Sequence, residues 1–232
     1  MDKQYLKDNY DTLIKDIKDT CEKAGKDFND ITLIAVSKTF SAEDIVIVNK
    51  SGQIHFGENK VQELKSKFDI LGSENIKWHL IGHLQSNKVK YVADFVYLIH
   101  SVDSLKLAEV INEQAKKHNR TIDILVQVNT SNEDQKSGIE PEDVRSLCLE
   151  ISKLENVCIK GLMTIGMFTD DEDVIRDNFK SLKSVYDELK SDYPSFKYLS
   201  MGMTSDYKIA IEEGANMLRI GSAIFGYRNY SN

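Results

Sequence analysis

Two basic residues stand in otherwise apolar sequence, and each could do chemistry there. Lys38 follows the apolar run ITLIAVS, on the same side of a strand as Ile34 and Val36. Burial lowers the pKa of a lysine and makes Schiff-base chemistry accessible near neutrality, although a lysine in a solvated loop fits the same sequence. Arg219 lies within NMLRIG, where alternation directs it inward together with Met217. A buried guanidinium needs a partner, which is either a structural carboxylate or a ligand.

Hydroxyl groups and glycines near the end of the chain predict a phosphate site. The run SMGMTSD, which contains Ser200 and Thr204, has the character of a strand end, a turn and a helix start. Unpaired N–H groups at such a start attract anions, and Gly221 and Ser222 offer a second such turn one strand later. An ordinary helix cap uses the same residue types. The Asp206 carboxylate would repel a phosphate, so we expect it to turn away.

The other reactive residue types predict no further site. The five histidines show no HxH or HxxxH spacing, so a metal centre is not expected. Cys21, Cys148 and Cys158 form no CxxC pair and suggest reduced thiols in a cytoplasmic protein. We find no secretory signal and no membrane span. A net charge of −7 argues against nucleic-acid and acidic-membrane binding, but leaves local phosphate binding open.

The elements that must position these residues alternate along the chain. Its 232 residues are 41% hydrophobic and 29% charged, as expected of a globular protein. Residues 2–24 show the spacing of an amphipathic helix. Eight apolar or β-branched runs then predict strands at 31–37, 53–57, 76–82, 95–101, 122–129, 158–166, 197–202 and 216–221. Helical patterns separate them at 42–50, 58–70, 86–93, 103–118, 141–154, 171–190 and 205–213.

This alternation predicts an α/β fold, a single (β/α)₈ TIM barrel with an extra N-terminal helix, formed by one domain over residues 1–232. An open doubly wound sheet is the alternative. In a barrel the reactive groups lie at the carboxyl ends of the strands, and the loops after strands seven and eight are the usual phosphate site. Lys38 on the first strand would then lie next to the phosphate loops.

Several ordered motifs resemble a known family. The segments LIAVSKTFS, HFGENKVQE, WHLIGHLQSNK, GLMTIG and LSMGMTSDYKIAIEEGANMLRIGSAIFG are similar to those of the pyridoxal phosphate homeostasis proteins, which resemble the N-terminal barrel of alanine racemase. The resemblance runs from about residue 10 to 228. It implies a barrel of the fold type III class that binds pyridoxal 5′-phosphate (PLP), acts in vitamin B6 homeostasis without catalytic turnover, and is a monomer.

The resemblance also implies roles for individual residues. Lys38 would form a Schiff base with the cofactor, Asn59 would lie beside its ring, and Arg219 would face the pyridine nitrogen. The phosphate would be held by Ser200, Thr204, Gly221 and Ser222. An arginine cannot give the ring nitrogen a proton, which leaves the ring a weaker electron sink. His83 stands where relatives have proline, so no role carries over to it.

Other functions stay open at this point. One is a PLP-dependent racemase or lyase, and another is an aldolase-like barrel in which Lys38 attacks a phosphorylated carbonyl compound. A third is contact delivery of the cofactor to PLP-dependent apoenzymes. Racemisation needs a base on each face of the substrate, and the racemase takes its second base from another domain. We therefore expect little racemase activity from this chain.

Overall fold

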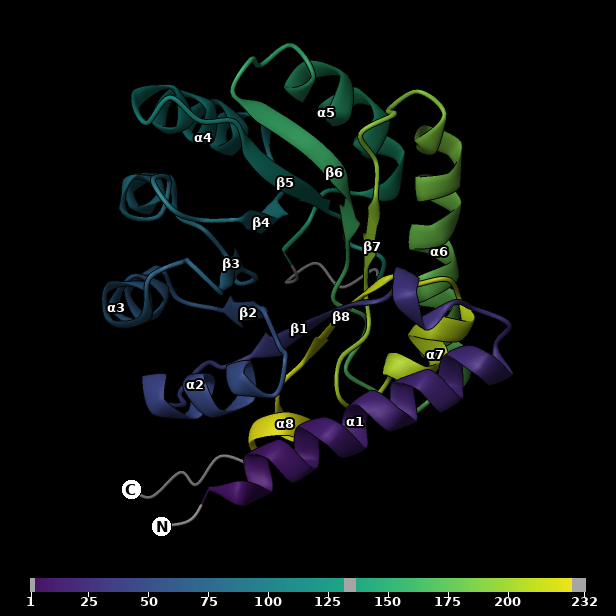
Figure 1. Ribbon diagram of the computed structural model, residues 1–232. Helices are drawn as coiled ribbons and strands as arrows, with labels where there is room; N and C mark the ends of the chain where they lie inside the picture. The colour runs from purple at the N-terminus through teal and green to yellow at the C-terminus, as the bar shows by residue number, and fades with distance from the viewer. Residues whose placement is uncertain (1–2, 132–136, 227–232) are drawn as a thin grey trace.

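A closed barrel of eight strands forms the centre of the computed structural model, which describes residues 3–131 and 137–226 (Figure 1). Each strand pairs in parallel with the next, and β8 returns to β1. The strands are β1 (Thr32–Val36), β2 (His55–Glu58), β3 (Lys77–Leu80), β4 (Leu98–Val102), β5 (Ile122–Gln127), β6 (Val157–Met163), β7 (Tyr198–Ser200) and β8 (Met217–Ile220). The predicted barrel is confirmed, and its closure rules out the open sheet.

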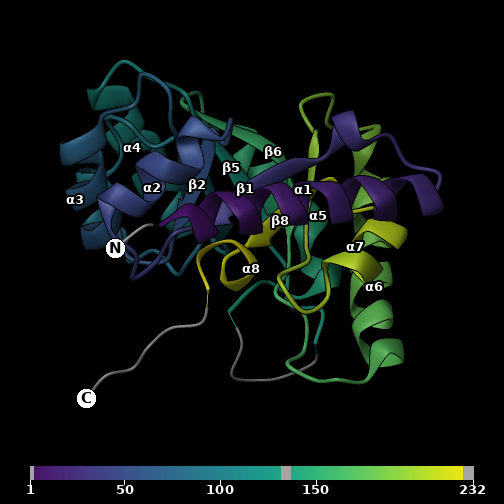
Figure 2. The same ribbon diagram turned by 60° about the horizontal axis from the view of Figure 1, so that its bottom comes forward.

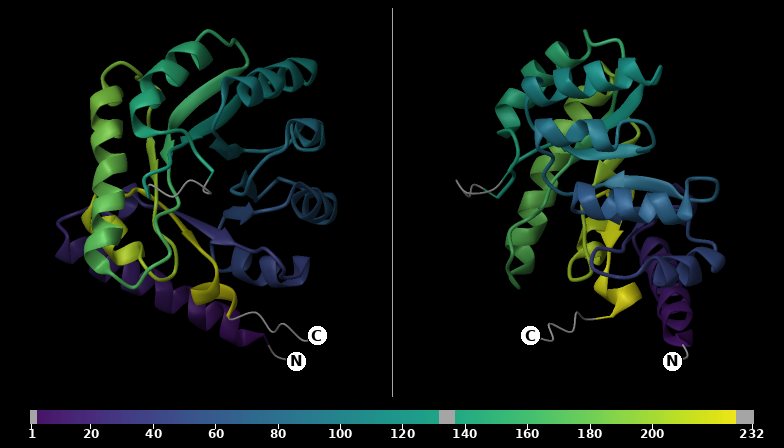
Figure 3. Two further views of the ribbon diagram at one scale, coloured as in Figure 1. Left: turned by 180° about the vertical axis from the view of Figure 1, so that it is seen from behind. Right: turned by 90° about the vertical axis from the view of Figure 1, so that its left-hand side faces the viewer.

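Helices surround the barrel (Figure 3). The α-helices are α1 (Gln4–Lys23), α2 (Ala42–Lys50), α3 (Val61–Leu71), α4 (Leu105–Lys117), α5 (Val144–Ile151), α6 (Glu172–Lys190), α7 (Tyr207–Glu212) and α8 (Ser222–Phe225). Short 3₁₀ helices cover Phe28–Asp30, Ser86–Tyr91 and Pro141–Asp143. The helical segment predicted at 86–93 is a 3₁₀ helix over Ser86–Tyr91, and α8 was not predicted. Among the described residues, no helix combines the length and apolar character that crossing a membrane requires.

The inside of the barrel is divided between apolar and polar side chains. Inward residues of six strands form an apolar cluster: Ile34, Leu98, Leu125, Met163, Tyr198 and Met217. The alternation predicted for β8 is confirmed, because Met217 belongs to this cluster and Arg219, two positions later, is only 4% exposed. The barrel therefore buries a guanidinium beside its hydrocarbon core.

Helix α1, with 20 residues, packs across the side of the barrel next to the 4-residue helix α8 (Figure 2). Its buried face, which includes Leu6 and Leu13, joins the main hydrophobic core. Polar contacts fix its position along its length. Asn9 Nδ2 donates to the carbonyl of Ile224 at 3.1 Å, and Asp16 pairs with Lys208 of α7 at 2.8 Å. The extra N-terminal helix is thus part of the ring that encloses the sheet.

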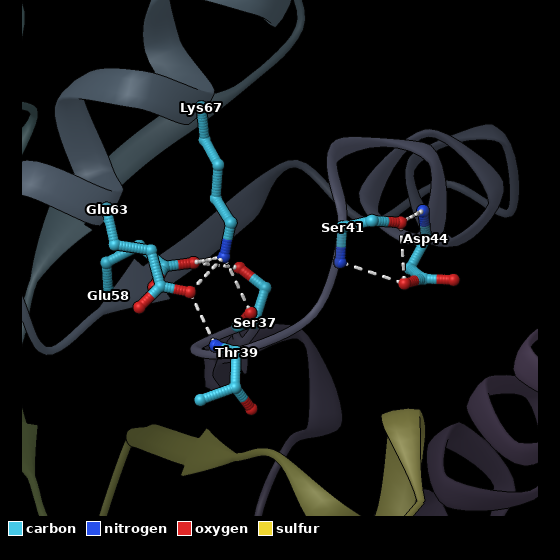
Figure 4. A network of polar contacts seen from close by, with 7 residues as sticks. All are labelled: Ser37, Thr39, Ser41, Asp44, Glu58, Glu63 and Lys67. Atoms are coloured by element: carbon cyan, nitrogen blue, oxygen red, sulfur yellow. Dashed lines mark hydrogen bonds and ion pairs between the residues drawn. The ribbon is translucent and has the colours of Figure 1, made fainter.

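A buried polar network joins the ends of β1 and β2 to α3 (Figure 4). Lys67 Nζ donates to Glu58 Oε1 at 2.7 Å, to Glu63 Oε1 at 2.7 Å and to the Ser37 carbonyl at 2.8 Å. Ser37 Oγ donates to the same Glu58 oxygen at 2.6 Å. The Thr39 N–H donates to Glu63, which holds Thr39 at a φ of 72° that β-branched residues rarely adopt. The network therefore fixes the backbone on both sides of Lys38.

Glu58 is the electrostatically costly member of this network. Its side chain is fully buried, and Oε2 has no hydrogen-bond partner in the part of the chain that the structure describes. Burial raises the pKa of Glu58 to about 7, against the opposing effects of Lys67 and Ser37. A carboxylate in this position is tolerated because the ammonium of Lys67 lies beside it.

We expect Lys67→Met to destabilise the protein by about 3–5 kcal/mol, because it leaves Glu58 buried without a cation. Chemical denaturation monitored by circular dichroism measures the loss. Lys65→Met is the matched control on the same helix, since Lys65 pairs with Asp69 in a partly exposed position and such pairs contribute about 0–1 kcal/mol. Equal losses in the two variants would contradict the role assigned to the network.

Candidate functional site

A cavity of about 880 Å³ opens at the carboxyl ends of the strands. Its polar lining includes Lys38, Asn59, His83, Thr204, Ser205, Arg219 and Ser222. Gly221 also lines it, and Phe40, Ile81 and Ile165 add apolar wall. Most of the residues predicted for the site are thus brought together on one cavity surface.

Lys38 reaches the cavity because β1 points it inward. Ile34 is in the apolar cluster inside the barrel and Val36 lines the cavity, so the side shared by these three residues is the predicted one. The Lys38 side chain is half-buried. Two residues further on, Phe40 stacks on Phe225 with ring centroids 5.0 Å apart. The backbone on both sides of Lys38 is therefore held in place, by the polar network around Ser37 and Thr39 and by the stacking of Phe40.

Asn59 follows β2 and is positioned by a close approach of backbone. A Cβ atom added at Gly82 would lie 2.3 Å from the Asn59 carbonyl oxygen, so no side chain fits at this position without displacing that backbone. Gly82 and its neighbours Ile81 and His83 line the cavity beside Asn59. The glycine of the IGH segment therefore sets how near the ends of β2 and β3 can come.

The two predicted phosphate loops both face the cavity. After β7 the chain turns through Gly202 at a φ of 93°, and Thr204 then lines the wall. Asp206 is not part of the lining, because its Oδ1 accepts from the N–H of Met203 at 2.5 Å. Its carboxylate closes the turn by this hydrogen bond. After β8, the neighbouring strand, Gly221 and Ser222 also line the cavity.

Arg219 combines burial with an unusual set of partners. Its NH1 donates to Ser200 Oγ at 2.6 Å, and its NH2 donates to the Thr164 carbonyl at 2.7 Å. Within the described ranges no ion pair joins it to a carboxylate, and Asp206 acts on it only through space. Burial lowers the pKa of Arg219 to about 10, so it is still charged at neutral pH. Of the two partners proposed from the sequence, a structural carboxylate is therefore not found among the described residues, and neutral oxygens hold the guanidinium.

Ser200 differs from the other predicted site residues. Its side chain is fully buried and is not part of the cavity wall. The hydroxyl lies under Arg219 and 3.4 Å from His100 Nδ1. In this geometry the hydroxyl supports Arg219. The sequence could not distinguish this role from a phosphate contact, because both require a hydroxyl at the end of β7.

Some features of the site carried no signal in the sequence. Phe40, Ile81 and Ile165 are apolar residues of the types that usually pack in a core. They line the cavity because they lie just after strand ends. His83 lines the cavity although the motifs assigned it no role. Across the described residues, no group of three or more His, Cys, Asp or Glu side chains is placed to hold a metal ion.

Comparisons with known proteins agree with this arrangement. The chain matches the family model of the alanine racemase N-terminal domain over residues 9–229. The pyridoxal phosphate homeostasis protein of Aquifex aeolicus is 41% identical over 219 residues, which cover 94% of this chain and 96% of that protein. An unknown protein from Bifidobacterium adolescentis has a crystal structure with a TM-score of 0.92 at 34% identity, and the match covers 97% of both chains.

A further solved structure contains the cofactor. PipY of Synechococcus elongatus with PLP bound matches with a TM-score of 0.78 at 36% identity, over 85% of this chain and 93% of that chain. The resemblance first seen in the motifs is confirmed by these matches. The chain belongs to the family of pyridoxal phosphate homeostasis proteins, within the larger family of the alanine racemase N-terminal domain.

Proposed function

We propose that this protein binds PLP in the cavity at the carboxyl end of its barrel and acts in intracellular PLP homeostasis without catalytic turnover. The observation that carries the proposal is that three kinds of functional group line the same cavity. Lys38 supplies an amine, Arg219 supplies a guanidinium that has no carboxylate partner among the described residues, and two hydroxyl-bearing loops would supply phosphate contacts. The names of the relatives and the PLP bound to PipY support the same conclusion.

The residues present fit the parts of PLP. When bound, the cofactor supplies an aldehyde and an electron-accepting ring. Lys38 would hold the aldehyde carbon covalently. Thr204, Gly221 and Ser222 would bind the phosphate, and Asn59 would lie beside the ring. Arg219 would direct its remaining N–H groups at the ring nitrogen.

The role of Arg219 favours binding over turnover. A guanidinium donates hydrogen bonds but stays charged, so it does not protonate the ring nitrogen. An unprotonated ring stabilises carbanions less well. Arg219 would therefore hold the cofactor in a form that disfavours aminotransferase-type carbanion chemistry.

Racemase or lyase activity is the second candidate, and one observation favours it. His83 lines the same cavity as Lys38, so the wall carries a second group that can exchange protons. A protein that only binds PLP does not need proton exchange by His83.

The setting of the function is part of the proposal. Cys21, Cys148 and Cys158 are free thiols, which suits a reducing compartment, and we place the protein in the cytoplasm as a monomer. Apoenzymes that need PLP are the recipients we propose for the cofactor.

Replacement of Lys38 tests the covalent contact. After incubation with PLP and borohydride reduction, we expect wild-type protein to carry a pyridoxyl group on Lys38, and Lys38→Ala to carry none while keeping part of its affinity for PLP. Peptide mass mapping and equilibrium dialysis measure the two quantities. Lys208→Ala is the control, because Lys208 pairs with Asp16 at 2.8 Å and does not line the cavity. The same yield of adduct in Lys38→Ala and wild type would refute the assignment.

The phosphate loops are tested by comparing two ligands. We expect Thr204→Ala and Ser222→Ala each to weaken PLP binding roughly tenfold, because each removes a hydrogen bond to a charged group. Binding of pyridoxal, which lacks the phosphate, should change much less. Isothermal titration with both ligands gives the comparison. Equal weakening for PLP and pyridoxal would show that the hydroxyls act elsewhere.

A steady-state assay separates homeostasis from catalysis. We expect PLP-loaded wild-type protein to show no racemisation or elimination above the free cofactor across a panel of L- and D-amino acids. Chiral chromatography and keto-acid detection provide the readouts. Turnover that is abolished by His83→Ala while PLP binding is retained would replace the leading proposal with the racemase or lyase.

A further inference from the structure

Three histidines form a continuous row through the inside of the barrel. His55, His79 and His100 come from the neighbouring strands β2, β3 and β4. His55 Nδ1 lies 2.8 Å from His79 Nε2, and His79 Nδ1 lies 2.9 Å from His100 Nε2. His79 and His100 have no exposed surface, whereas His55 is partly exposed. We call these three residues the histidine row.

The histidine row ends at the proposed cofactor site. His100 Nδ1 lies 3.4 Å from Ser200 Oγ, which accepts a hydrogen bond from Arg219 NH1 at 2.6 Å. His55 is the first residue of β2 and Ser200 the last of β7, so the row together with Ser200 runs from the amino end of one strand to the carboxyl end of another. A hydrogen-bonded path thus links Arg219 to the opposite end of the barrel.

The chemistry of Arg219 gives this path a direction. A guanidinium only donates, so Ser200 Oγ accepts from it and can direct its own proton to His100 Nδ1. His100 then carries its proton on Nε2 and donates to His79, which donates in the same way to His55. In this arrangement each of the three rings is the neutral Nε2–H tautomer.

The charges that face the row favour neutral rings. Lys77 and Lys197 act on His55 at one end, and Arg219 acts on His100 at the other. Burial, together with these cations, lowers the pKa of His55 to about 4 and the pKa values of His79 and His100 well below the usual range. In the Nε2–H arrangement each ring accepts on the side of Arg219 and donates on the other side. The row therefore turns the negative ends of its dipoles toward the buried cation.

The geometry points to the histidine row as a set of positioning residues for Arg219. By fixing the Ser200 hydroxyl as an acceptor and by stabilising the guanidinium with aligned dipoles, the row allows Arg219 to be buried without a carboxylate. The full positive charge then faces the cavity and its ligand. That the ligand is PLP rests on the function proposed above. The order of hydrogen-bond donors and acceptors along the histidine row does not depend on that proposal.

The first experiment examines the row without any ligand. Long-range ¹H–¹⁵N spectra of protein labelled at histidine report the protonation of each ring nitrogen between pH 5.5 and 8.5. We expect His55, His79 and His100 to stay neutral with the proton on Nε2 over this range. His83 and His118 are exposed and serve as internal references. An Nδ1–H tautomer or a cationic ring in the row at pH 7 would overturn the proposal.

The second experiment tests the link to Arg219. We expect Ser200→Ala to shift the ring nitrogens of His100 and, more weakly, of His79. We expect His100→Phe to weaken PLP binding roughly tenfold and to displace the absorption band of the bound cofactor, while binding of inorganic phosphate is unchanged. Tyr97→Phe is the control, because the Tyr97 ring lies 5.3 Å from that of His79 but is not a member of the row.

The outcomes separate this inference from the proposed function. Wild-type protein that fails to bind PLP would refute the proposed function, while the tautomers could still be read. PLP binding and absorption that are the same in His100→Phe and Tyr97→Phe would refute the positioning role. If His100→Phe does not fold, the response of His100 to Ser200→Ala decides, and an unchanged His100 ring would count against the row.

Discussion

The hydrogen bonds between β1 and β8 close the barrel, and the cavity depends on that closure. Their register pairs Ile34 with Arg219, which brings the segment that carries Lys38 beside the loops that follow β7 and β8. In an open sheet these strands would lie apart, and the amine, the guanidinium and the hydroxyl loops would have no common surface. One line of backbone pairing therefore turns residues from the two ends of the sequence into a single site.

The sequence was sufficient for much of this arrangement, for identifiable reasons. Alternation along β1 and β8 predicted that Lys38 and Arg219 point inward, because the period of a strand is two and one side was apolar. The role of Ser200 was not predictable, since its hydroxyl could serve the cavity or Arg219. The histidine row was also hidden: its members are 24 and 21 positions apart, and only the register of three strands brings their rings together. The short α8 and the 3₁₀ geometry of Ser86–Tyr91 are local details that periodicity does not resolve.

Arg219 shows how a barrel can bury a charge and keep it available. A carboxylate partner would stabilise the guanidinium, but it would also neutralise the field that the cavity receives. Here the hydrogen-bond partners of Arg219 within the described ranges are a hydroxyl and a backbone carbonyl, and that hydroxyl lies beside His100. Lys67 has the opposite surroundings, because two carboxylates and a carbonyl accept hydrogen bonds from its ammonium. These contacts compensate its charge and fix the backbone at Ser37. The two buried cations thus differ in their surroundings: Arg219 lines the cavity, and Lys67 holds the backbone next to Lys38.

The docking of α1 has a consequence for the order in which the chain can assemble. Its contact with Ile224 spans 215 positions, so the first helix completes its packing only after the last strand and α8 have formed. On the ribosome, α1 emerges early with its hydrophobic face uncovered and must wait for almost the whole chain. Contacts of such long range slow folding, since a large loop has to close before they contribute. A chain that stalls before β8 would leave this face exposed, and quality-control factors that bind unpacked apolar helices could distinguish it from the finished barrel.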